Sequence, residues 1–220
     1  MRCLVVVAHP DDEAIWMGGT ILRFGGWDWH VLALCRGDDA DRAGRFTRAV
    51  AALGARGYIS NLDDASPELA PLAPDLSEIK DRITALLRRR GEPGTAGDFD
   101  LVFTHGRFGE YTRHLRHEQV HEAVVRLADS GRLKGGLVFF AYDDCGGRAR
   151  PMPSPTAEIL VELTPDEYAK KRRIVRDVYG FGPGSFEFEA AGPVEAFYCP
   201  APLRPSPFEL VLSNPGLGKG

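Results

Sequence analysis

The sequence predicts an α/β protein with a Rossmann-like open sheet of mostly parallel strands and helices on both faces. Apolar runs rich in β-branched residues recur along the chain, as is typical of strands buried on both faces of a parallel sheet. Between them lie segments whose apolar residues recur at helical spacing, and strands that alternate with helices favour parallel sheets. The 220 residues are enough for a single domain over 1–220 with a sizeable core.

The expected elements follow in order. Strands are predicted at 3–8, 29–35, 57–60, 100–105 and 136–142, and further short strands at 185–190 and 195–199. Helices are predicted at 14–24, 42–54 and 77–90, from the histidine-rich stretch to about Leu127, and after the N-cap sequence Thr164-Pro165-Asp166-Glu167. Residues 143–158 are expected to form a long loop that acts as a lid, and 200–220 an extended tail.

Composition excludes several classes of partner. The net charge of −4 gives no reason to expect nucleic acid or an anionic membrane. The basic clusters at 88–90 and 170–173 read as solvated helix faces. No apolar stretch approaches the ~20 residues that span a membrane. The first residues hold too short an apolar run for a signal peptide, and Cys3 and Cys35 read as buried free thiols, so we expect a cytoplasmic protein.

Polar clusters follow three of the predicted strands, at His9 to Glu13, Asp38 to Arg42 and His105 to His117. Open parallel sheets bind ligands outside the carboxyl ends of their strands. The three clusters should therefore meet at one edge of the sheet and form a site.

The first cluster, His9-Pro10-Asp11-Asp12-Glu13, has two interpretations. Its acids could stabilise a helix N-terminus, with His9 an ordinary loop residue. Alternatively, like charges packed together at a sheet edge indicate a bound cation. A histidine and a carboxylate suit a divalent metal ion, and the neighbouring carboxylate could act as a base.

Four stretches resemble the PIG-L/LmbE family of zinc-dependent deacetylases of N-acetylglucosaminyl compounds. They are VVVAHPDDEAIWMGGTI at 5–21, DADRAGRFTRAVAALG at 39–54, DFDLVFTHGRFGEYTRHLRHEQVHEAV at 98–124 and GPVEAFY at 192–198. The resemblance implies three zinc ligands, His9, Asp12 and His117. It also implies a general base, Asp11, and a side chain that stabilises the transition state, His114.

The same resemblance implies substrate contacts by Arg42, Asp64 and Tyr111. Three departures from the family pattern affect this region. Leu115-Arg116 replaces the usual Pro-Asp inside H-x-x-H, Arg45 stands where a glutamate is expected, and Tyr111 lies one residue further from the histidine than usual.

The resemblance further implies a cofactor and a reaction. Three protein ligands leave a coordination position open for water, as in catalytic Zn²⁺ sites, and Fe²⁺ suits the same ligands. The implied substrate is a small amino-sugar glycoside that loses its N-acetyl group. A homo-oligomer is compatible with the sequence.

Three other readings stay open. His117-Glu118-Gln119-Val120-His121 matches the H-E-x-x-H pattern of zinc peptidases, in which His117 and His121 would both bind metal and Glu118 would act as base. That reading leaves the first cluster unexplained and lacks a third ligand, so we expect His121 to lie behind the site or on the helix surface. An amidase for another N-acyl or thiol-conjugate substrate would use the same ligands. A non-catalytic binding module is the third, although no G-x-G-x-x-G follows the first strand.

Overall fold

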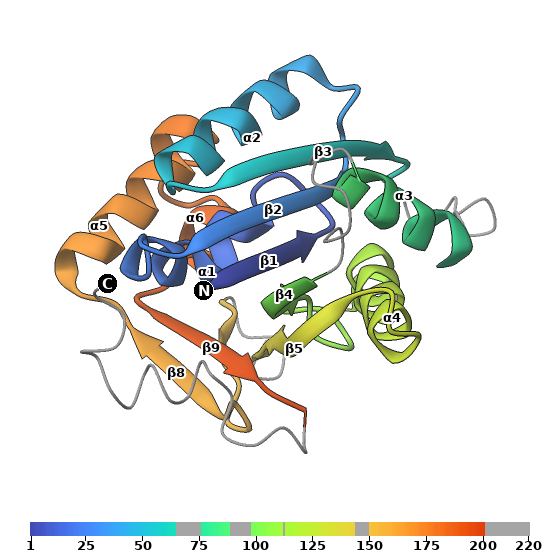
Figure 1. Ribbon diagram of the computed structural model, residues 1–220. Coiled ribbons are helices and arrows are strands. Elements are labelled where there is room, and N and C mark those ends of the chain that lie inside the picture. The colour runs from blue at the N-terminus through green and yellow to red at the C-terminus, as the bar shows by residue number, and fades with distance from the viewer. Residues whose placement is uncertain (65–75, 89–97, 112, 144–149, 201–220) are drawn as a thin grey trace.

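A computed structural model describes residues 1–64, 76–88, 98–111, 113–143 and 150–200. Its main sheet has seven strands in the order β3-β2-β1-β4-β5-β9-β8 (Figure 1). The first five run parallel, namely β1 (Arg2–Val7), β2 (Asp28–Cys35), β3 (Arg56–Leu62), β4 (Asp98–Thr104) and β5 (Lys134–Phe140). β9 (Val194–Tyr198) and β8 (Ile159–Glu162) pair antiparallel at one edge. The predicted fold class, an open and mostly parallel sheet, is therefore confirmed.

β1 lies at the centre of this sheet between β2 and β4. It is buried from Cys3 to Val7, which explains its unbroken apolar run. The chain adds strands on one side of β1 up to β3 and then crosses to the other side with β4. The loops that follow β1 and β4 therefore lie at the point where the strand order reverses, the usual place for a ligand in such a sheet.

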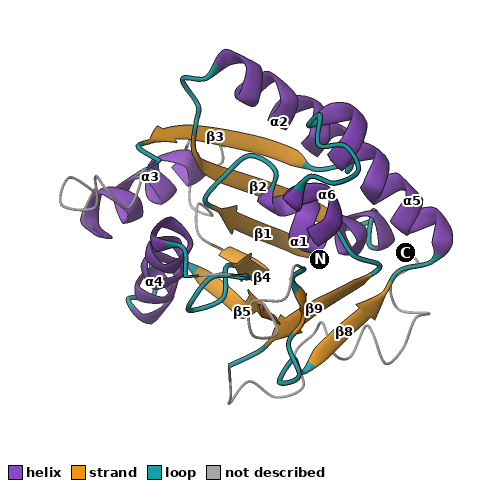
Figure 2. Ribbon diagram, turned by 180° about the vertical axis from the view of Figure 1, so that it is seen from behind, coloured by secondary structure: helices purple, strands orange, loops and turns teal. Residues whose placement is uncertain are grey.

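Helices cover both faces of the sheet (Figure 2). One apolar core packs α1 (Asp12–Arg23), α2 (Ala40–Ala52) and the short α6 (Phe186–Ala190) against one face. A second core packs α3 (Leu76–Arg88) and α4 (Leu115–Asp129) against the other. α5 (Pro165–Arg173) follows β8 and begins with the predicted cap, in which Thr164 and Glu167 form a capping box.

Two predictions about the last third of the chain are wrong, and one strand was missed. Residues 185–190 do not form a strand, because the Ser185 hydroxyl accepts a hydrogen bond from the Phe188 N–H and starts α6. β8 was not predicted. Part of the expected loop at 143–158 forms a small hairpin, in which β6 (Tyr142–Asp143) pairs with β7 (Met152–Pro153). The predicted tail lies outside the described residues from 201 onward.

The basic cluster at 170–173 is not a uniformly solvated face. Lys171 is buried and its ammonium group donates to Glu195 at 2.7 Å. Arg172 stacks on the ring of Phe188, 3.3 Å from its centroid. α5 continues into a π-helical turn, η2 (Ile174–Val178), which brings Tyr179 to the α1 side of the sheet, where its hydroxyl donates to Glu13. Among the described residues, no helix is long and apolar enough to cross a membrane.

Candidate active site

The site forms where two neighbouring central strands end. His9, Asp11 and Asp12 lie in the turn from β1 into α1, and α1 starts at Asp12. β4 runs beside β1 and leads through the 105–114 loop to α4, whose N-cap is His114 and whose first turn carries His117. Residues a hundred positions apart therefore meet at the carboxyl edge of the sheet, as the sequence predicts.

Three ligand atoms converge there. His9 Nδ1 lies 3.1 Å from His117 Nε2 and 3.3 Å from Asp12 Oδ2. His117 Nε2 lies 3.6 Å from the same Asp12 oxygen. Tetrahedral zinc with bonds of about 2.0–2.1 Å would place its ligand atoms about 3.3 Å apart. The three atoms are therefore spaced as a divalent metal ion requires.

Carboxylates fix the orientation of both rings. His117 Nδ1 lies 2.6 Å from Glu110 Oε2, and His9 Nε2 lies 2.8 Å from Asp64 Oδ1. We assign the protons to these two nitrogens, since carboxylates accept hydrogen bonds. The lone pairs of the other two ring nitrogens then point at each other and at Asp12. A carboxylate behind each ligating histidine is the common arrangement in metal sites.

Such a convergence of acceptors calls for a positive charge. Burial alone would lower the pKa of His9, but hydrogen bonds and charge from Asp12 and Asp64 raise it to about 10. The environment therefore stabilises a cation at this point, and a proton or a divalent ion can supply it. The histidine and carboxylate donors and their spacing fit Zn²⁺ or Fe²⁺.

Sequence reasoning missed two buried residues behind the ligands, Glu110 and His105. Glu110 accepts from His105 Nδ1 at 3.1 Å and from the Gly106 N–H at 2.9 Å, besides its bond to His117. Burial would raise its pKa, but the two histidines outweigh burial and lower it to about 2. His105 Nε2 accepts the Ala8 N–H at 2.8 Å, so its lone pair is already engaged. Glu110 belongs to the G-E-Y segment that resembles the family, so the sequence offered it as a candidate, but only Tyr111 of that segment was predicted to have a role.

Asp11 occupies a strained position beside the ligand Asp12. Its φ of 139° is unusual for a residue with a side chain, and such strain concentrates at functional sites. Arg42 Nη1 lies 3.3 Å from its carboxylate. Burial and the adjacent charge of Asp12 raise the pKa of Asp11 well above its usual range. The carboxylate therefore holds a proton more readily than an exposed aspartate.

His114 lies at the open side of the same cluster. Its ring stacks on His117 with centroids 4.3 Å apart and meets His9 edge-on at 5.0 Å. Its buried Nδ1 has no hydrogen-bond partner among the described residues. Burial, followed by the charges of His117 and His9, lowers its pKa to about 4, so the ring is neutral in the free protein near pH 7. A neutral imidazole still offers one N–H donor.

The three predicted substrate contacts fall in different places. Arg42 and Asp64 line the same cavity as the ligands, which measures about 270 Å³ and which we call the metal cleft. Asp64 also bonds His9, so it serves to orient a ligand. Tyr111 lies outside the lining of the metal cleft and packs on Phe186, with ring centroids 5.0 Å apart.

The departures from the family pattern have structural roles. Arg116 is buried and binds Gln119 at 2.7 Å and the carbonyl oxygen of Asp63, which ties α4 to the segment that carries Asp64. Arg45 bonds Asp41 at 2.8 Å and the carbonyl oxygen of Tyr179. The three proposed ligands, His9, Asp12 and His117, still converge in the presence of both arginines.

His121 lies one turn further along α4 and is buried. Its Nδ1 donates to the carbonyl oxygen of His105 at 2.8 Å. The ring packs on Phe139 with centroids 4.5 Å apart and lines a separate cavity. His121 therefore lies behind the cluster, which is one of the two positions that we expected for it. This geometry does not support the peptidase reading, in which His121 binds metal.

Comparison with known proteins agrees with this fold. A family model described as PIG-L, GlcNAc-PI de-N-acetylase, matches residues 4–128. None of the curated proteins matches the chain. Among solved structures, the conserved protein TT1542 from Thermus thermophilus is 24% identical with a TM-score of 0.60, covering 92% of this chain and 95% of that one. The N,N'-diacetylchitobiose deacetylase from Pyrococcus horikoshii is 17% identical with a TM-score of 0.57, covering 87% and 71%.

A third solved structure shows that the fold serves more than one reaction. The 4-carboxy-2-hydroxymuconate hydratase from Pseudomonas putida is 15% identical with a TM-score of 0.58, covering 92% of this chain and 98% of that one. At such identities the likeness establishes the fold alone, and the reaction has to be argued from the site.

The open and mostly parallel α/β sheet, with a cluster of histidines and carboxylates at its switch point, defines the class of protein. Within that class, the chain belongs to the PIG-L family.

Proposed function

We propose that the protein is a metal-dependent hydrolase that removes the N-acetyl group from a small N-acetylglucosaminyl glycoside or a similar amino sugar. The observation that carries the proposal is the convergence of His9 Nδ1, Asp12 Oδ2 and His117 Nε2 within 3.1–3.6 Å of one another, with the free carboxylate of Asp11 next to them. The family match and the deacetylases among the structural neighbours support the same reaction.

His9, Asp12 and His117 would hold the ion, with Zn²⁺ as the first candidate and Fe²⁺ as the second. When bound, the ion supplies Lewis acidity that polarises the amide carbonyl and makes hydroxide available near pH 7. Glu110 and Asp64 accept the protons of the opposite ring nitrogens of His117 and His9, and this orients the ligating nitrogens toward that ion.

Asp11 would act as the general base and then as the acid. Its raised pKa lets it accept the proton of the attacking water and return it to the amide nitrogen as the C–N bond breaks. Arg42 lies against its outer oxygen and keeps the carboxylate directed into the metal cleft. The products are acetate and the free amine.

His114 would stabilise the charge that develops on the carbonyl oxygen. Its low pKa makes it a neutral N–H donor. A preorganised donor of this kind contributes about 3–4 kcal/mol to transition-state stabilisation.

The polar side chains around the metal cleft suit a hydroxylated substrate. Arg36, Arg42, Asp64 and Glu187 line it beside the ligands. These groups can donate to and accept from sugar hydroxyls. Tyr111, which lines the neighbouring cavity, would contact a more distant part of the substrate. Nucleic acid is not a proposed partner. Cys3 and Cys35 are buried free thiols, which fits a reducing compartment such as the cytoplasm.

The direct test is an assay of amine release from a panel of N-acetylglucosaminides and other N-acyl amines, with metal-loaded and chelator-treated protein. We expect amine release that chelation abolishes and Zn²⁺ or Fe²⁺ restores. Because one structural neighbour is a hydratase, the same protein should also be offered an unsaturated acid. Hydration of that acid without any amine release would contradict the proposal.

A further inference from the structure

Two more cavities adjoin the metal cleft. The connecting cavity, of about 270 Å³, is lined by Trp16, Glu110, Tyr111, His114, His117 and Phe186. Four of these residues, namely Trp16, His114, His117 and Phe186, also line the metal cleft. A larger side chamber, of about 640 Å³, shares Glu110 and Tyr111 with the connecting cavity. The three cavities therefore lie in a row of neighbours that begins at the proposed metal ligands.

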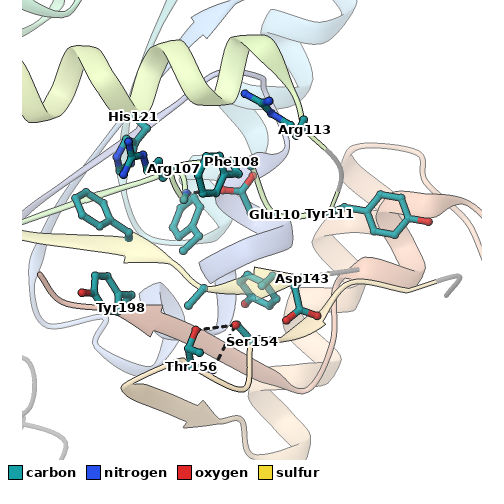
Figure 3. A pocket seen from close by; sticks show the side chains of 16 residues that line it. Arg107, Phe108, Glu110, Tyr111, Arg113, His121, Asp143, Ser154, Thr156 and Tyr198 are labelled. Carbon is teal, nitrogen blue, oxygen red and sulfur yellow. Dashed lines mark hydrogen bonds between the residues drawn. The ribbon is translucent and has the colours of Figure 1, made fainter. Parts of the chain in front are cut away.

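The side chamber has the composition of a binding site for an apolar group. Its walls include the rings of Phe108, Phe139, Phe140, Tyr142 and Tyr198. In Figure 3, His121 and Arg113 lie above the chamber and Ser154 and Thr156 below it. The hydroxyls of Ser154 and Thr156 lie 3.0 Å apart and bond each other. Its volume lies within the range of about 300–1,000 Å³ that is usual for small-molecule sites.

The one carboxylate between the two cavities is already satisfied. Glu110 accepts hydrogen bonds from His105, His117 and the Gly106 N–H, and it is almost fully buried. It therefore does not require a polar ligand group on the side that faces the chamber. The charged heads of Arg107 and Arg113 lie over the ring of Phe108, 5.5 and 5.8 Å from its centroid.

The position of Asp11 indicates whether the amine or the acyl group of an amide substrate faces the connecting cavity. In hydrolysis the oxygen of water bonds to the carbonyl carbon, and Asp11 passes the proton to the nitrogen that leaves. The amine must therefore lie on the side of Asp11, where Arg36, Arg42 and Asp64 provide polar contacts. None of these four residues lines the connecting cavity, whose lining includes Trp16, Tyr111 and Phe186. The acyl group is left to point into the connecting cavity.

We propose that the site accepts N-acyl groups larger than acetyl, with an extended apolar acyl chain or aryl group that runs through the connecting cavity into the side chamber. The inference rests on the proposed amide hydrolysis and names its acyl specificity. An acetyl methyl would leave both cavities empty. Each further methylene that becomes buried should improve binding by about fourfold.

The test compares N-acetyl- and N-octanoylglucosamine as substrates, and acetate and octanoate as product ligands in calorimetry. The wild-type protein should show kcat/KM at least tenfold higher for the octanoyl substrate and bind octanoate at least tenfold more tightly. Thr156→Trp places a large ring in the chamber and should remove both preferences. Thr47→Trp, the same exchange on an exposed face of α2, should keep them.

The outcomes separate this inference from the proposed function. Hydrolysis of the acetyl substrate with no gain for octanoyl would overturn the inference and leave the function standing. If neither amide is cleaved, the proposed function fails and the binding arm decides. Octanoate binding that Thr156→Trp abolishes then supports the chamber as an acyl site, and octanoate binding no tighter than acetate, or equal in both tryptophan variants, refutes it.

Discussion

The position of Asp11 in the chain gives its carboxylate the properties of a catalytic base. Asp11 precedes Asp12, a proposed metal ligand, and lies at the N-cap of α1, with a positive φ and a buried carboxylate beside another carboxylate. Both the burial and the neighbouring charge raise its proton affinity. A side chain under these conditions is costly to stability, so its presence indicates function.

Asp11→Asn should keep the metal and lose turnover. Asparagine preserves the shape and the contact with Arg42 but cannot accept the water proton, so we expect kcat to fall by at least about 10². Metal content and single-turnover amine release measure the two effects separately. Turnover within a few-fold of the wild type would remove Asp11 as the base.

Glu110→Gln should weaken metal binding. Glutamine can accept only on one atom, whereas Glu110 accepts from the two Nδ1 protons of His105 and His117 on different oxygens. Loss of such a carboxylate behind a metal ligand typically costs 10–100-fold in affinity. Competition with a fluorescent chelator measures the affinity. The control is Glu118→Gln in the first turn of α4, where the carboxylate pairs with Arg113. Equal affinities for both variants would argue against the role given to Glu110.

At the scale of elements, α1 contains a kink at Met17, and a buried carboxylate holds the helix in place after the kink. Met17 departs from helical backbone angles, and the N–H groups of Gly19 and Thr20 are bound instead by the Glu195 carboxylate at 2.8 and 2.6 Å. Lys171 offsets the charge of Glu195. One buried ion pair therefore joins α1, α5 and β9 and holds the helix that begins with Asp12.

Lys171→Met should destabilise the protein by about 3–5 kcal/mol, because it leaves Glu195 as an uncompensated buried charge. Urea denaturation followed by circular dichroism measures the free energy of unfolding. Lys170→Met is the matched control on the exposed side of α5 and should change it by less than about 0.5 kcal/mol. The role of the pair is contradicted if the two variants unfold at the same urea concentration.

For the whole molecule, the buried thiols report on the integrity of the two cores. Cys3 and Cys35 are fully buried, one in each core. Burial raises the pKa of Cys35 to about 12 and that of Cys3 further, so neither thiol is ionised at pH 8.

A variant with Cys145→Ser and Cys199→Ser should therefore react with Ellman's reagent only after unfolding. We expect essentially no colour from the native protein at pH 8 and two thiols per chain in guanidinium chloride. Rapid reaction of either thiol in the native protein would show that its core is open to solvent and would contradict the described packing.

The sequence predicted the five parallel strands and the edge at which the polar clusters meet, because both depend on local patterns. The choice of His9, Asp12 and His117 as ligands came from the resemblance to the family and stays a prediction. Buried strands carry apolar runs, and the polar residues that follow them meet at one edge of the sheet. The errors arose where tertiary contacts decide. Phe186 to Ala190 alternates apolar and acidic residues as a strand would, yet the Ser185 cap makes it helical. Lys171 resembles its exposed neighbours, and only Glu195 from a distant strand explains its burial.

The metal content of three proteins tests the central claim most directly. Elemental analysis should find about one Zn²⁺ or Fe²⁺ per chain in the wild type and in His121→Ala, and a large loss in His117→Ala, with folding confirmed by circular dichroism. His117 is a ligand in this account and His121 is not. Retention of metal by His117→Ala, or its loss from a folded His121→Ala protein, would contradict the assigned site.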